Sequence, residues 1–554
     1  MRAAHGLPLR EHRLQIGGTP KQLASLTALH VSRQEAPWRL WLRLSVGTLL
    51  AAWCVHGAVR ALRQLPVLGT WGWLRQRAER LPRGLRWALL GSSLAAGLLL
   101  PWVSLRVGAL VAYGALALLQ PMGSLYLAVA ALPLAPNMVL LGIGAFSVTE
   151  ITLLVATASV AWNALLRPGR EVRGALLRGW AAIRWADVAV VCLVLLALAG
   201  SLSAEYRKEA LRELRVVVVE SALLYALVRM QGYGTRRRLL DVYCLAAMGV
   251  AVFALARYPS PDGVIVAEGV RRARAFYGSP NNLALVLERL LPVGLAVLLW
   301  GRSRWRRYLY GLGAGVLGIA VVLTLSRGAL LLGLPAALLV LALRGGRKAT
   351  WLLLGGVAAG LALGVTLLGV ERLSALADPR QGTALLRVSL WRSACAMIRD
   401  RPWLGVGPDN FLYYYGDYIL PGAEVDRWLS HPHNLLLDSW VRLGIGGVLL
   451  VMVLVGGFVR EALRLRRLLT RDAEAMAVGM IAGMAAAVAH GMADAFYFVP
   501  ELAMWFMFAL GWVMGGVRAP GEVPAGSPPV PVPGENAGVS SQMIMSLEGD
   551  RSVK

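Results

Sequence analysis

Polar and aromatic residues gather in one stretch, 401–447, of a chain that is otherwise mostly apolar. The centre of this stretch reads His-Pro-His-Asn at 431–434, and an apolar run that predicts a helix follows at once. The N-terminal end of a helix carries a partial positive charge and unpaired N–H groups, which disfavour an imidazolium ion and attract anions. A neutral His433 at this helix start could therefore act as a general base beside an anionic substrate.

Neighbours of His433 could support it. His431 could be a second titratable group or only a packed neighbour, and Asn434 stands at the predicted helix start. Asp438 follows about one helical turn later and could orient a neighbouring side chain. A glycine, Gly444, stands ten residues after Asn434.

Three arginines near the ends of apolar runs could bind an anion. Arg274 precedes the turn Gly-Ser-Pro-Asn-Asn, Arg327 is wedged between two apolar runs, and Arg387 lies in a segment whose apolar residues recur at helical spacing. That spacing predicts an amphipathic helix lying on the membrane. Arginine is suited to binding phosphate oxygens in pairs. The alternatives are an arginine that only reaches toward lipid headgroups and, for Arg387, the polar face of an interfacial helix.

The composition of the chain indicates whether these residues belong to a soluble protein or to a membrane protein. Hydrophobic residues make up 57% of the 554 residues and charged residues only 16%, which indicates a polytopic membrane protein. The net charge of +26 does not indicate a nucleic-acid partner, because Lys and Arg fall in short clusters between apolar runs, the pattern of the positive-inside rule. The four cysteines show no CxxC spacing, so neither a zinc site nor a disulfide framework is expected.

Apolar runs long enough to cross a bilayer follow one another from Trp87 onward. We expect an all-α transmembrane bundle of about 12 to 14 spans, since about 20 helical residues cross a core about 30 Å thick. A moderately apolar stretch at 44–60 could be a further span or an interfacial helix. The candidate spans are 87–104, 106–120, 122–141, 147–164, 185–200, 214–229, 239–256, 283–300, 309–325, 328–343, 351–370, 434–459, 474–491 and 499–516.

The basic clusters predict the orientation. Arginine-rich loops that all fall on one side of the predicted spans lie at 167–184, 236–238, 302–307, 344–348 and 460–471. By charge bias that side is the cytoplasm, and the loop that holds His433 is then extracytoplasmic. The expected organisation is a basic N-terminal region at 1–86, transmembrane helices at 87–370, an extracytoplasmic catalytic loop with short amphipathic helices at 371–433, transmembrane helices at 434–517 and a disordered cytoplasmic tail at 518–554.

The order of these motifs resembles the O-antigen ligase family, within a wider group that includes O-antigen polymerases and bacterial protein O-oligosaccharyltransferases. The likeness rests on Ser-Arg-Gly at 326–328, on the arginine-containing segment that runs into Asp-Arg-Pro-Trp-Leu-Gly-Val-Gly-Pro at 400–408, and on His433-Asn434 with a glycine ten residues later. It covers roughly residues 185–517 and is strongest at 380–447. The N-terminal region has no counterpart in the family, so its role stays open.

The resemblance implies a GT-C-type membrane glycosyltransferase of lipopolysaccharide or polysaccharide biosynthesis. Such an enzyme moves a glycan from an undecaprenyl-diphosphate carrier to an acceptor at the outer face of the cytoplasmic membrane, with inversion and without a metal ion or other cofactor. By motif, His433 matches the family's base, and Arg327, Arg387 and Arg274 match arginines that engage the diphosphate. The residues agree, because the carboxylates of the loop form no Asp-x-Asp pair of the kind that metal-dependent glycosyl transfer uses.

Two questions stay open at this stage. A small-solute or anion transporter would also fit such a bundle, and it would use Glu220 and Glu288, which lie inside or near predicted spans. Within the family, a glycan, lipid or protein hydroxyl would be activated by the same base, so ligase, polymerase and protein oligosaccharyltransferase are not separated. The loop tyrosines and Trp428 fit either an interfacial aromatic belt or a surface on which sugars stack.

Overall fold

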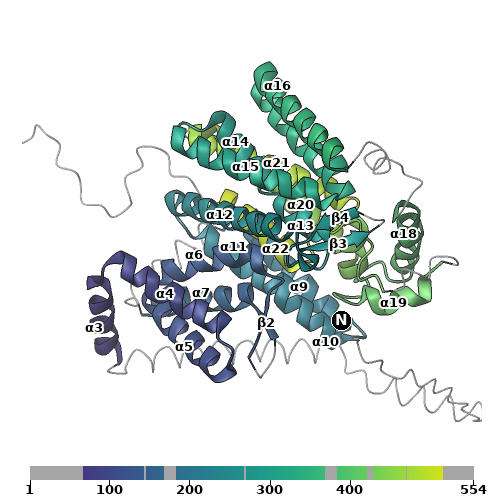
Figure 1. Ribbon diagram of the computed structural model, residues 1–554. Coiled ribbons are helices and arrows are strands. Elements are labelled where there is room, and N and C mark those ends of the chain that lie inside the picture. The colour runs from purple at the N-terminus through teal and green to yellow at the C-terminus, as the bar shows by residue number, and fades with distance from the viewer. Residues whose placement is uncertain are drawn as a thin grey trace, which may run out of the picture. The chain divides into compact units, whose positions relative to one another are not determined.

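The computed structural model describes residues 67–141, 145–166, 183–267, 270–368, 383–420, 428–468 and 471–515 (Figure 1). The basic arm, the stretch at 44–60, most of the loop at 167–184 and the tail from 518 lie outside the described residues. The chain divides into two units, Met1–Leu81 with Leu165–Arg167 and Pro82–Ala164 with Pro168–Lys554. The first contributes the helix α3 (Val67–Arg80), and every predicted site residue belongs to the second.

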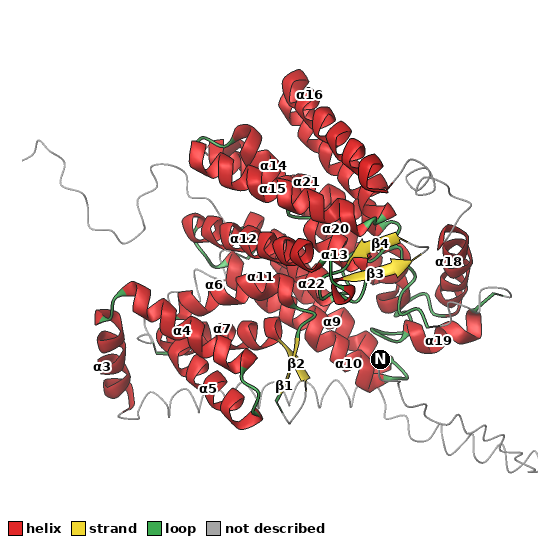
Figure 2. Ribbon diagram, viewed as in Figure 1, coloured by secondary structure: helices red, strands yellow, loops and turns green. Residues whose placement is uncertain are grey.

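Helices dominate the described residues, and the strands among them form two short antiparallel hairpins (Figure 2). The hairpins pair β1 (Met138–Leu140) with β2 (Ala145–Ser147) and β3 (Val264–Ala267) with β4 (Val270–Ala273). The helices of the second unit are α4 (Arg83–Leu99), α5 (Val103–Leu119), α6 (Pro121–Ala131), η1 (Leu132–Leu134), α7 (Val148–Leu165), α9 (Trp185–Ser203), α10 (Arg207–Glu213), η2 (Leu214–Val219), α11 (Glu220–Arg229), α12 (Tyr233–Arg257), η3 (Pro261–Gly263), α13 (Pro280–Leu287), α14 (Leu291–Trp300), α15 (Arg304–Thr324), η4 (Ala329–Gly333), α16 (Leu334–Leu368), α18 (Thr383–Asp400), α19 (Phe411–Tyr418), α20 (Leu435–Leu468), α21 (Arg471–Gly491) and α22 (Pro500–Met514). The predicted all-α polytopic bundle is confirmed.

Fewer helices than expected are long enough to cross a membrane by themselves. In the described part of the chain there are eight, at Val148–Leu165, Trp185–Ser203, Tyr233–Arg257, Pro280–Trp300, Arg304–Thr324, Ala329–Arg347, Leu435–Arg466 and Asp472–Gly491. The expected spans at 106–120, 122–141 and 499–516 form shorter apolar helices, at Val103–Leu119, Pro121–Leu134 and Pro500–Met514. The span at 214–229 begins as the π-helix η2, and the one at 351–370 shares α16 with its predecessor across a kink at Gly346.

A proline explains the break in one long span. Pro292 lacks a backbone N–H, and its ring conflicts with the carbonyl group four residues earlier, at Glu288. The span is therefore divided into α13 and α14. Glu288 and Arg289 stand between these two half-helices and are fully buried. The break thus places two ionisable side chains inside the bundle.

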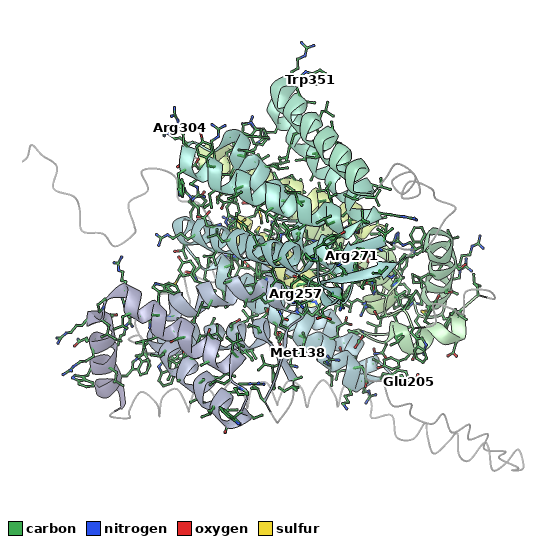
Figure 3. The ribbon with its side chains drawn as sticks, viewed as in Figure 1. Met138, Glu205, Arg257, Arg271, Arg304 and Trp351 are labelled. Carbon is green, nitrogen blue, oxygen red and sulfur yellow. The ribbon has the colours of Figure 1, made fainter. Side chains whose placement is uncertain are left out.

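The arginine-rich loops meet at one end of the bundle, as the charge pattern predicts. The contacts that join them are Arg237–Asp472 (3.5 Å), Arg344–Glu474 (2.6 Å), Arg184–Glu461 (2.9 Å) and a hydrogen bond from the backbone N–H of Arg302 to Asp472. Figure 3 shows Arg304, at the start of α15, and Arg271, on β4, on opposite sides of the bundle. The motifs singled out in the sequence lie at the end opposite the arginine-rich loops, where α15 and α21 finish and α20 begins.

The segment between α16 and α20 builds a small core of its own. The predicted amphipathic helix is present as α18, and it lies beside α19 and the start of α20 (Figure 1). Leu390, Ala394 and Met397 of α18 are buried in a cluster with Phe411 of α19 and Val441 of α20. The apolar face of α18 is therefore packed against protein, where a helix lying on the membrane was expected. This packing fixes the polar side of α18, including Arg387, relative to the start of α20.

Candidate active site

Asn434 explains why a helix starts directly after His433. Its Oδ1 accepts hydrogen bonds from the backbone N–H groups of Leu436 (3.0 Å) and Leu437 (3.1 Å), the arrangement of a helix N-cap. Its Nδ2 donates to the carbonyl oxygen of Met492 at 3.0 Å. The side chain of Asn434 therefore caps α20 and also ties its first turn to the segment that follows α21.

Gly444 allows a second attachment of α20. Its φ of +66° kinks the helix, and a Cβ at this position would lie 1.9 Å from the carbonyl oxygen of Trp403. The loop after α18 thus passes directly over the kink, where Ile445 N donates to Pro402 O (3.0 Å) and Val406 N donates to Val441 O (2.7 Å). Asn434 caps the start of α20 and Gly444 kinks the helix ten residues later. Both residues attach this end of α20 to other segments, which explains the spacing between them.

Left-handed backbone marks the same motifs. Among the described residues other than glycine, only Ala275, Leu325, Asp409 and His433 have positive φ, between +49° and +52°. Each lies in or beside a motif that the sequence singled out: Arg274, Ser-Arg-Gly, Gly-Val-Gly-Pro-Asp-Asn-Phe and His-Pro-His-Asn. Such conformations cost of order 1–3 kcal/mol each and tend to gather at functional sites, where the surrounding structure enforces them. Left-handed backbone therefore coincides with each of the motifs that the sequence singled out.

His433 forms a pair with an aspartate that the sequence did not single out. Its Nδ1 lies 2.9 Å from Oδ1 of Asp494, which follows the end of α21. An ionised carboxylate takes its hydrogen bond from Nδ1–H, which leaves Nε2 free to accept a proton. His433 is partly exposed, whereas the Asp494 side chain is only 4% exposed. The pair therefore presents an oriented, accessible imidazole held by a buried carboxylate.

Asp494 is stabilised in its ionised form. Burial acts to raise the pKa of this carboxyl, but interactions with His431 and His433 and the charges of His433 and His490 outweigh burial and hold that pKa well below its usual value. The backbone N–H of Ala495 also donates to Oδ1 at 2.8 Å. Because the folded pKa is depressed, ionised Asp494 contributes stability above the unfolded pKa of about 3.9, and that contribution is lost as the pH falls through the folded value.

Two arginines approach Asp494 from different elements. Arg387 of α18 places Nη2 4.0 Å from Asp494 Oδ2. Arg272 of β4 donates to Asn281 Oδ1 at 3.0 Å, and Asn281 Nδ2 in turn donates to Asp494 Oδ2 at 3.2 Å. Arg272 Nε also donates to the carbonyl oxygen of Thr324, the last residue of α15. Asp494 is thus in contact with side chains from α13, from α18 and from the residue pair that precedes α20, and Asn281 links it to β4.

The other predicted arginines occupy different places. Arg327 lies in the turn between α15 and the π-helix η4, and the next residue, Gly328, packs against His490 near the end of α21. Arg274 lies just beyond β4, and its Nε is buried without a hydrogen bond. In the described part of the chain, no hydrogen bond or ion pair joins Arg274 to His433 or Asp494. The hairpin reaches the site through Arg272 instead.

The two supporting residues nearest the base have separate roles. His431 contacts the ring of His433, with centroids 4.2 Å apart, and its Nδ1 lies 3.1 Å from Ser430 Oγ. Asp438 holds the buried Arg442 at 2.7 Å, and Arg442 donates to the carbonyl oxygen of Ser430 at 3.0 Å. Asp438 thus orients Arg442, which is hydrogen-bonded to the backbone just before the two histidines.

A metal ion is the alternative for this cluster. His431, His433 and Asp494 offer ligand atoms that all lie within 4.8 Å of one another. Two observations favour the hydrogen-bonded pair: the 2.9 Å separation of His433 Nδ1 and Asp494 Oδ1 is a hydrogen-bond distance, and Asp494 already accepts from Asn281 and Ala495. A divalent cation would also sit close to Arg387.

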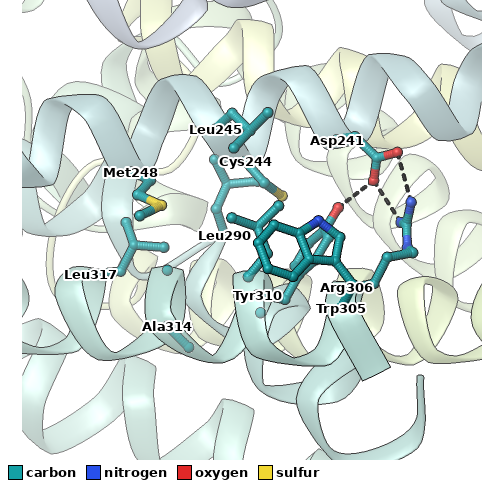
Figure 4. Close-up of a pocket in the computed structure, with 13 residues that line it drawn as sticks. Asp241, Cys244, Leu245, Met248, Leu290, Trp305, Arg306, Tyr310, Ala314 and Leu317 are labelled. Atoms are coloured by element: carbon teal, nitrogen blue, oxygen red, sulfur yellow. Dashed lines mark hydrogen bonds and ion pairs between the residues drawn. The ribbon is translucent and has the colours of Figure 1, made fainter. Parts of the chain in front are cut away.

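A cavity of about 250 Å³ lies apart from this cluster, between α12, α14 and α15 (Figure 4). Asp241 in its wall pairs with Arg306 at 2.7 Å and accepts a hydrogen bond from Tyr310, and much of the remaining lining is apolar. None of the predicted site residues lines it. The cavity therefore does not extend the site around His433.

Asp494, Asn281 and Arg272 were missed as functional residues from the sequence. One signal in the sequence points to Asp494. It is an acid shortly after the predicted span 474–491, and this span ends on the same side of the membrane on which the preceding span begins, at His433-Asn434. Arg272 and Asn281 belong to the same segment as Arg274, but nothing in the sequence distinguishes them from Arg274.

Comparison with known proteins agrees with these motifs. Residues 312–452, about a quarter of the chain, match the family model described as O-Antigen ligase. The match contains Arg327, Arg387 and His433, while Arg272, Asn281 and Asp494 lie outside it. The comparison with curated proteins gives no match. Over residues 312–452, the chain is therefore similar to the O-antigen ligase family.

Proposed function

We propose that this protein is a metal-independent, inverting membrane glycosyltransferase that moves a glycan from an undecaprenyl-diphosphate carrier to an acceptor hydroxyl. The observation that carries the proposal is His433 Nδ1 at 2.9 Å from the buried Asp494, with Arg387 close by. A carboxylate-held imidazole is suited to general base catalysis. Guanidinium groups beside it are suited to a diphosphate leaving group.

The proposed step exchanges one bond to the anomeric carbon for another. His433 Nε2 takes the proton of the acceptor hydroxyl, and the acceptor oxygen attacks the anomeric carbon from the face opposite the diphosphate. The bond to the diphosphate oxygen breaks and its electron pair leaves with the carrier. Arg327 and Arg387 neutralise the charge that develops there, and Arg274 is proposed to join them; such stabilisation is often the largest single contribution to catalysis.

Asp494→Asn should lower turnover by about 10²- to 10⁴-fold, because a neutral amide neither stabilises the imidazolium that forms when Nε2 takes a proton nor fixes the tautomer with Nδ1 protonated. The substitution keeps the size of the side chain, so the protein should still fold. Steady-state transfer and size-exclusion elution of the purified protein measure both effects. An Asp494→Asn protein with near wild-type turnover would remove the carboxylate from the mechanism.

The site is proposed to face the outside of the cytoplasmic membrane, because the arginine-rich loops lie together at the other end of the bundle. In a background without native cysteines, Ser430→Cys should react with a membrane-impermeant thiol reagent in spheroplasts. Arg304→Cys, at the start of α15, should react only after the membrane is opened. The reverse pattern would place the site in the cytoplasm and overturn the proposed donor orientation.

The acceptor defines three subclasses of the proposal: ligation to a lipid, polymerisation on a glycan, and transfer to a protein hydroxyl. Transport of a small solute or anion is the alternative of another class. The two acids that it would use are paired, Glu220 with Arg215 at 3.6 Å and Glu288 with His490 at 2.8 Å. The polar groups of the predicted motifs gather at one end of the bundle, whereas transporters commonly bind their solute near the midplane.

The test is reconstitution of the purified chain with an undecaprenyl-diphosphate glycan and, in turn, a lipid, a glycan and a peptide acceptor. Consumption of the donor with formation of one coupled product is the expected result, and the acceptor that reacts assigns the subclass. Vesicles that take up a solute in a proton-dependent manner, without consuming donor in any arm, would support transport instead.

A further inference from the structure

Two ionisable side chains lie against each other inside the bundle, behind Asp494. Glu288, between α13 and α14, and His490, in the last turn of α21, are 0% and 1% exposed. His490 Nδ1 lies 2.8 Å from Glu288 Oε1, and its Nε2 lies 3.9 Å from Asp494 Oδ2. Each ring nitrogen of His490 therefore faces a carboxylate, one within the bundle and one in the site.

Packing alone does not account for this pair. Removing charged groups from water is costly, and apolar side chains of similar volume often stabilise a protein as well or better. Ionisable residues within transmembrane helices are therefore functional candidates, with their partners. The neighbouring Arg289 differs, because it donates to the carbonyl oxygens of Phe496 and Leu502 and lies over the ring of Trp505, which fixes the segment after α21.

Two glycines of the segment after Arg327 make room for the pair. A Cβ on Gly328 would lie 2.1 Å from His490 Nε2, and a Cβ on Gly333 would lie 2.3 Å from Glu288 Oε2. The π-helix η4 begins directly after Gly328 and includes Gly333, and such a distortion is frequent at functional sites. Gly328 directly follows Arg327, so the His490 ring packs against the turn that holds Arg327. It does so through Nε2, the nitrogen that also faces Asp494.

We propose that Glu288 and His490 are positioning residues for the base: they hold Asp494 from within the bundle and align it with the Arg327 turn. The inference rests on the proposed function, which it deepens. Asp494 Oδ1 is hydrogen-bonded to His433 and to the backbone N–H of Ala495. Asp494 Oδ2 accepts a hydrogen bond from Asn281, and it lies 3.9 Å from His490 Nε2 on the side of the bundle and 4.0 Å from Arg387 Nη2. Loss of His490 removes the contact that Oδ2 makes inside the bundle and leaves Asn281 and Arg387 beside it, so the carboxylate aligns His433 less well.

Kinetics give the first test. His490→Asn should lower turnover by about 10- to 100-fold with KM little changed. Residues that orient the directly acting groups of a site often have effects of this size. Glu288→Gln should act in the same direction. Gly328→Ala removes no functional group, yet it should also lower turnover because its methyl group displaces His490. The matched control is Gly318→Ala in α15, where a Cβ meets nothing within 4 Å.

The double variant separates alignment from general damage. In the His490→Asn background, Gly328→Ala should cost little further turnover, because the shorter side chain leaves room for the methyl group; contacting residues show such non-additivity. Fully additive losses in folded proteins would overturn the proposed contact. Should His490→Asn fail to fold, Glu288→Gln and Gly328→Ala carry the same test.

A second measurement needs no glycan substrate. Diethyl pyrocarbonate modifies unprotonated imidazole nitrogens, and peptide mass spectrometry of the purified full-length chain gives the rate at His433. Asp494→Asn calibrates the effect of releasing His433. His490→Asn should change the rate in the same direction and should add nothing in the Asp494→Asn background. A folded His490→Asn protein whose His433 reacts like wild type would overturn the inference. If His490→Asn changes the His433 rate as expected but the wild-type protein consumes no glycan donor, only the proposed function is refuted.

Discussion

His433→Ala should lower turnover by about 10²- to 10⁴-fold, the usual contribution of a general base. The variant should still assemble, because the side chain is partly exposed and its hydrogen bond goes to Asp494, which keeps Asn281 and Ala495 as partners. Steady-state transfer from a lipid-diphosphate donor measures the loss. KM for the donor should change little, since the base contacts the acceptor hydroxyl and acts as the bond breaks.

A matched control comes from the first turn of the same helix. Leu436→Ala alters a side chain that is 36% exposed and leaves His433, Asn434 and Asp494 in place, so its turnover should remain near that of wild type. If His433→Ala retains more than about a tenth of wild-type turnover, the loss falls below the range for a general base and His433 does not have this role. His431, whose ring contacts His433, would then be the next residue to replace.

Arg327→Lys should lose about 10²- to 10³-fold in turnover although it keeps the positive charge. Lysine lacks the planar fork with which arginine meets two phosphate oxygens, so a point charge does not replace it. The loss should fall mainly on turnover, because an interaction that strengthens as the glycosidic bond breaks lowers the barrier more than it tightens donor binding. Wild type, Arg327→Lys and Arg327→Ala are compared with the same lipid-diphosphate donor.

Arg304→Lys is the matched control, because Arg304 is exposed at the opposite end of the helix that leads to Arg327. It should leave turnover unchanged. Full activity of Arg327→Lys would show that charge alone suffices at this position and would contradict the proposed two-oxygen contact with the diphosphate.

The fold class and the position of the base could be predicted because they depend on local pattern. Long apolar runs predict transmembrane helices, and the His-Pro-His-Asn motif before such a run predicts a helix start, which Asn434 caps. The spacing of Leu390, Ala394 and Met397 predicts the helix α18, although it does not reveal that these residues pack against α19 and not against a membrane. Helix lengths are less predictable, because expected spans such as 106–120 form shorter apolar helices and the one at 214–229 begins as a π-helix.

The partners of the base could not be predicted, because they depend on contacts between distant segments. His433 and Asp494 are 61 residues apart, and Asn281 and Asp494 are 213 residues apart. No spacing rule joins positions in different helices of a bundle. The choice of Arg274 over Arg272 has the same cause, since the two differ only in which of them reaches Asn281 and Thr324. The requirement for glycine after Arg327 likewise could not be predicted, because it depends on packing against His490, which lies on a helix far along the chain.

We propose that Asp494 holds His433 as a base and that the reaction needs no metal ion. The most direct test is transfer by purified wild-type protein with and without excess chelator, combined with measurement of bound metal by mass spectrometry. We predict equal turnover in both samples and no stoichiometric metal. Loss of turnover with chelator, restored by adding back Zn²⁺ or Mn²⁺, would contradict the account and would identify His431, His433 and Asp494 as metal ligands.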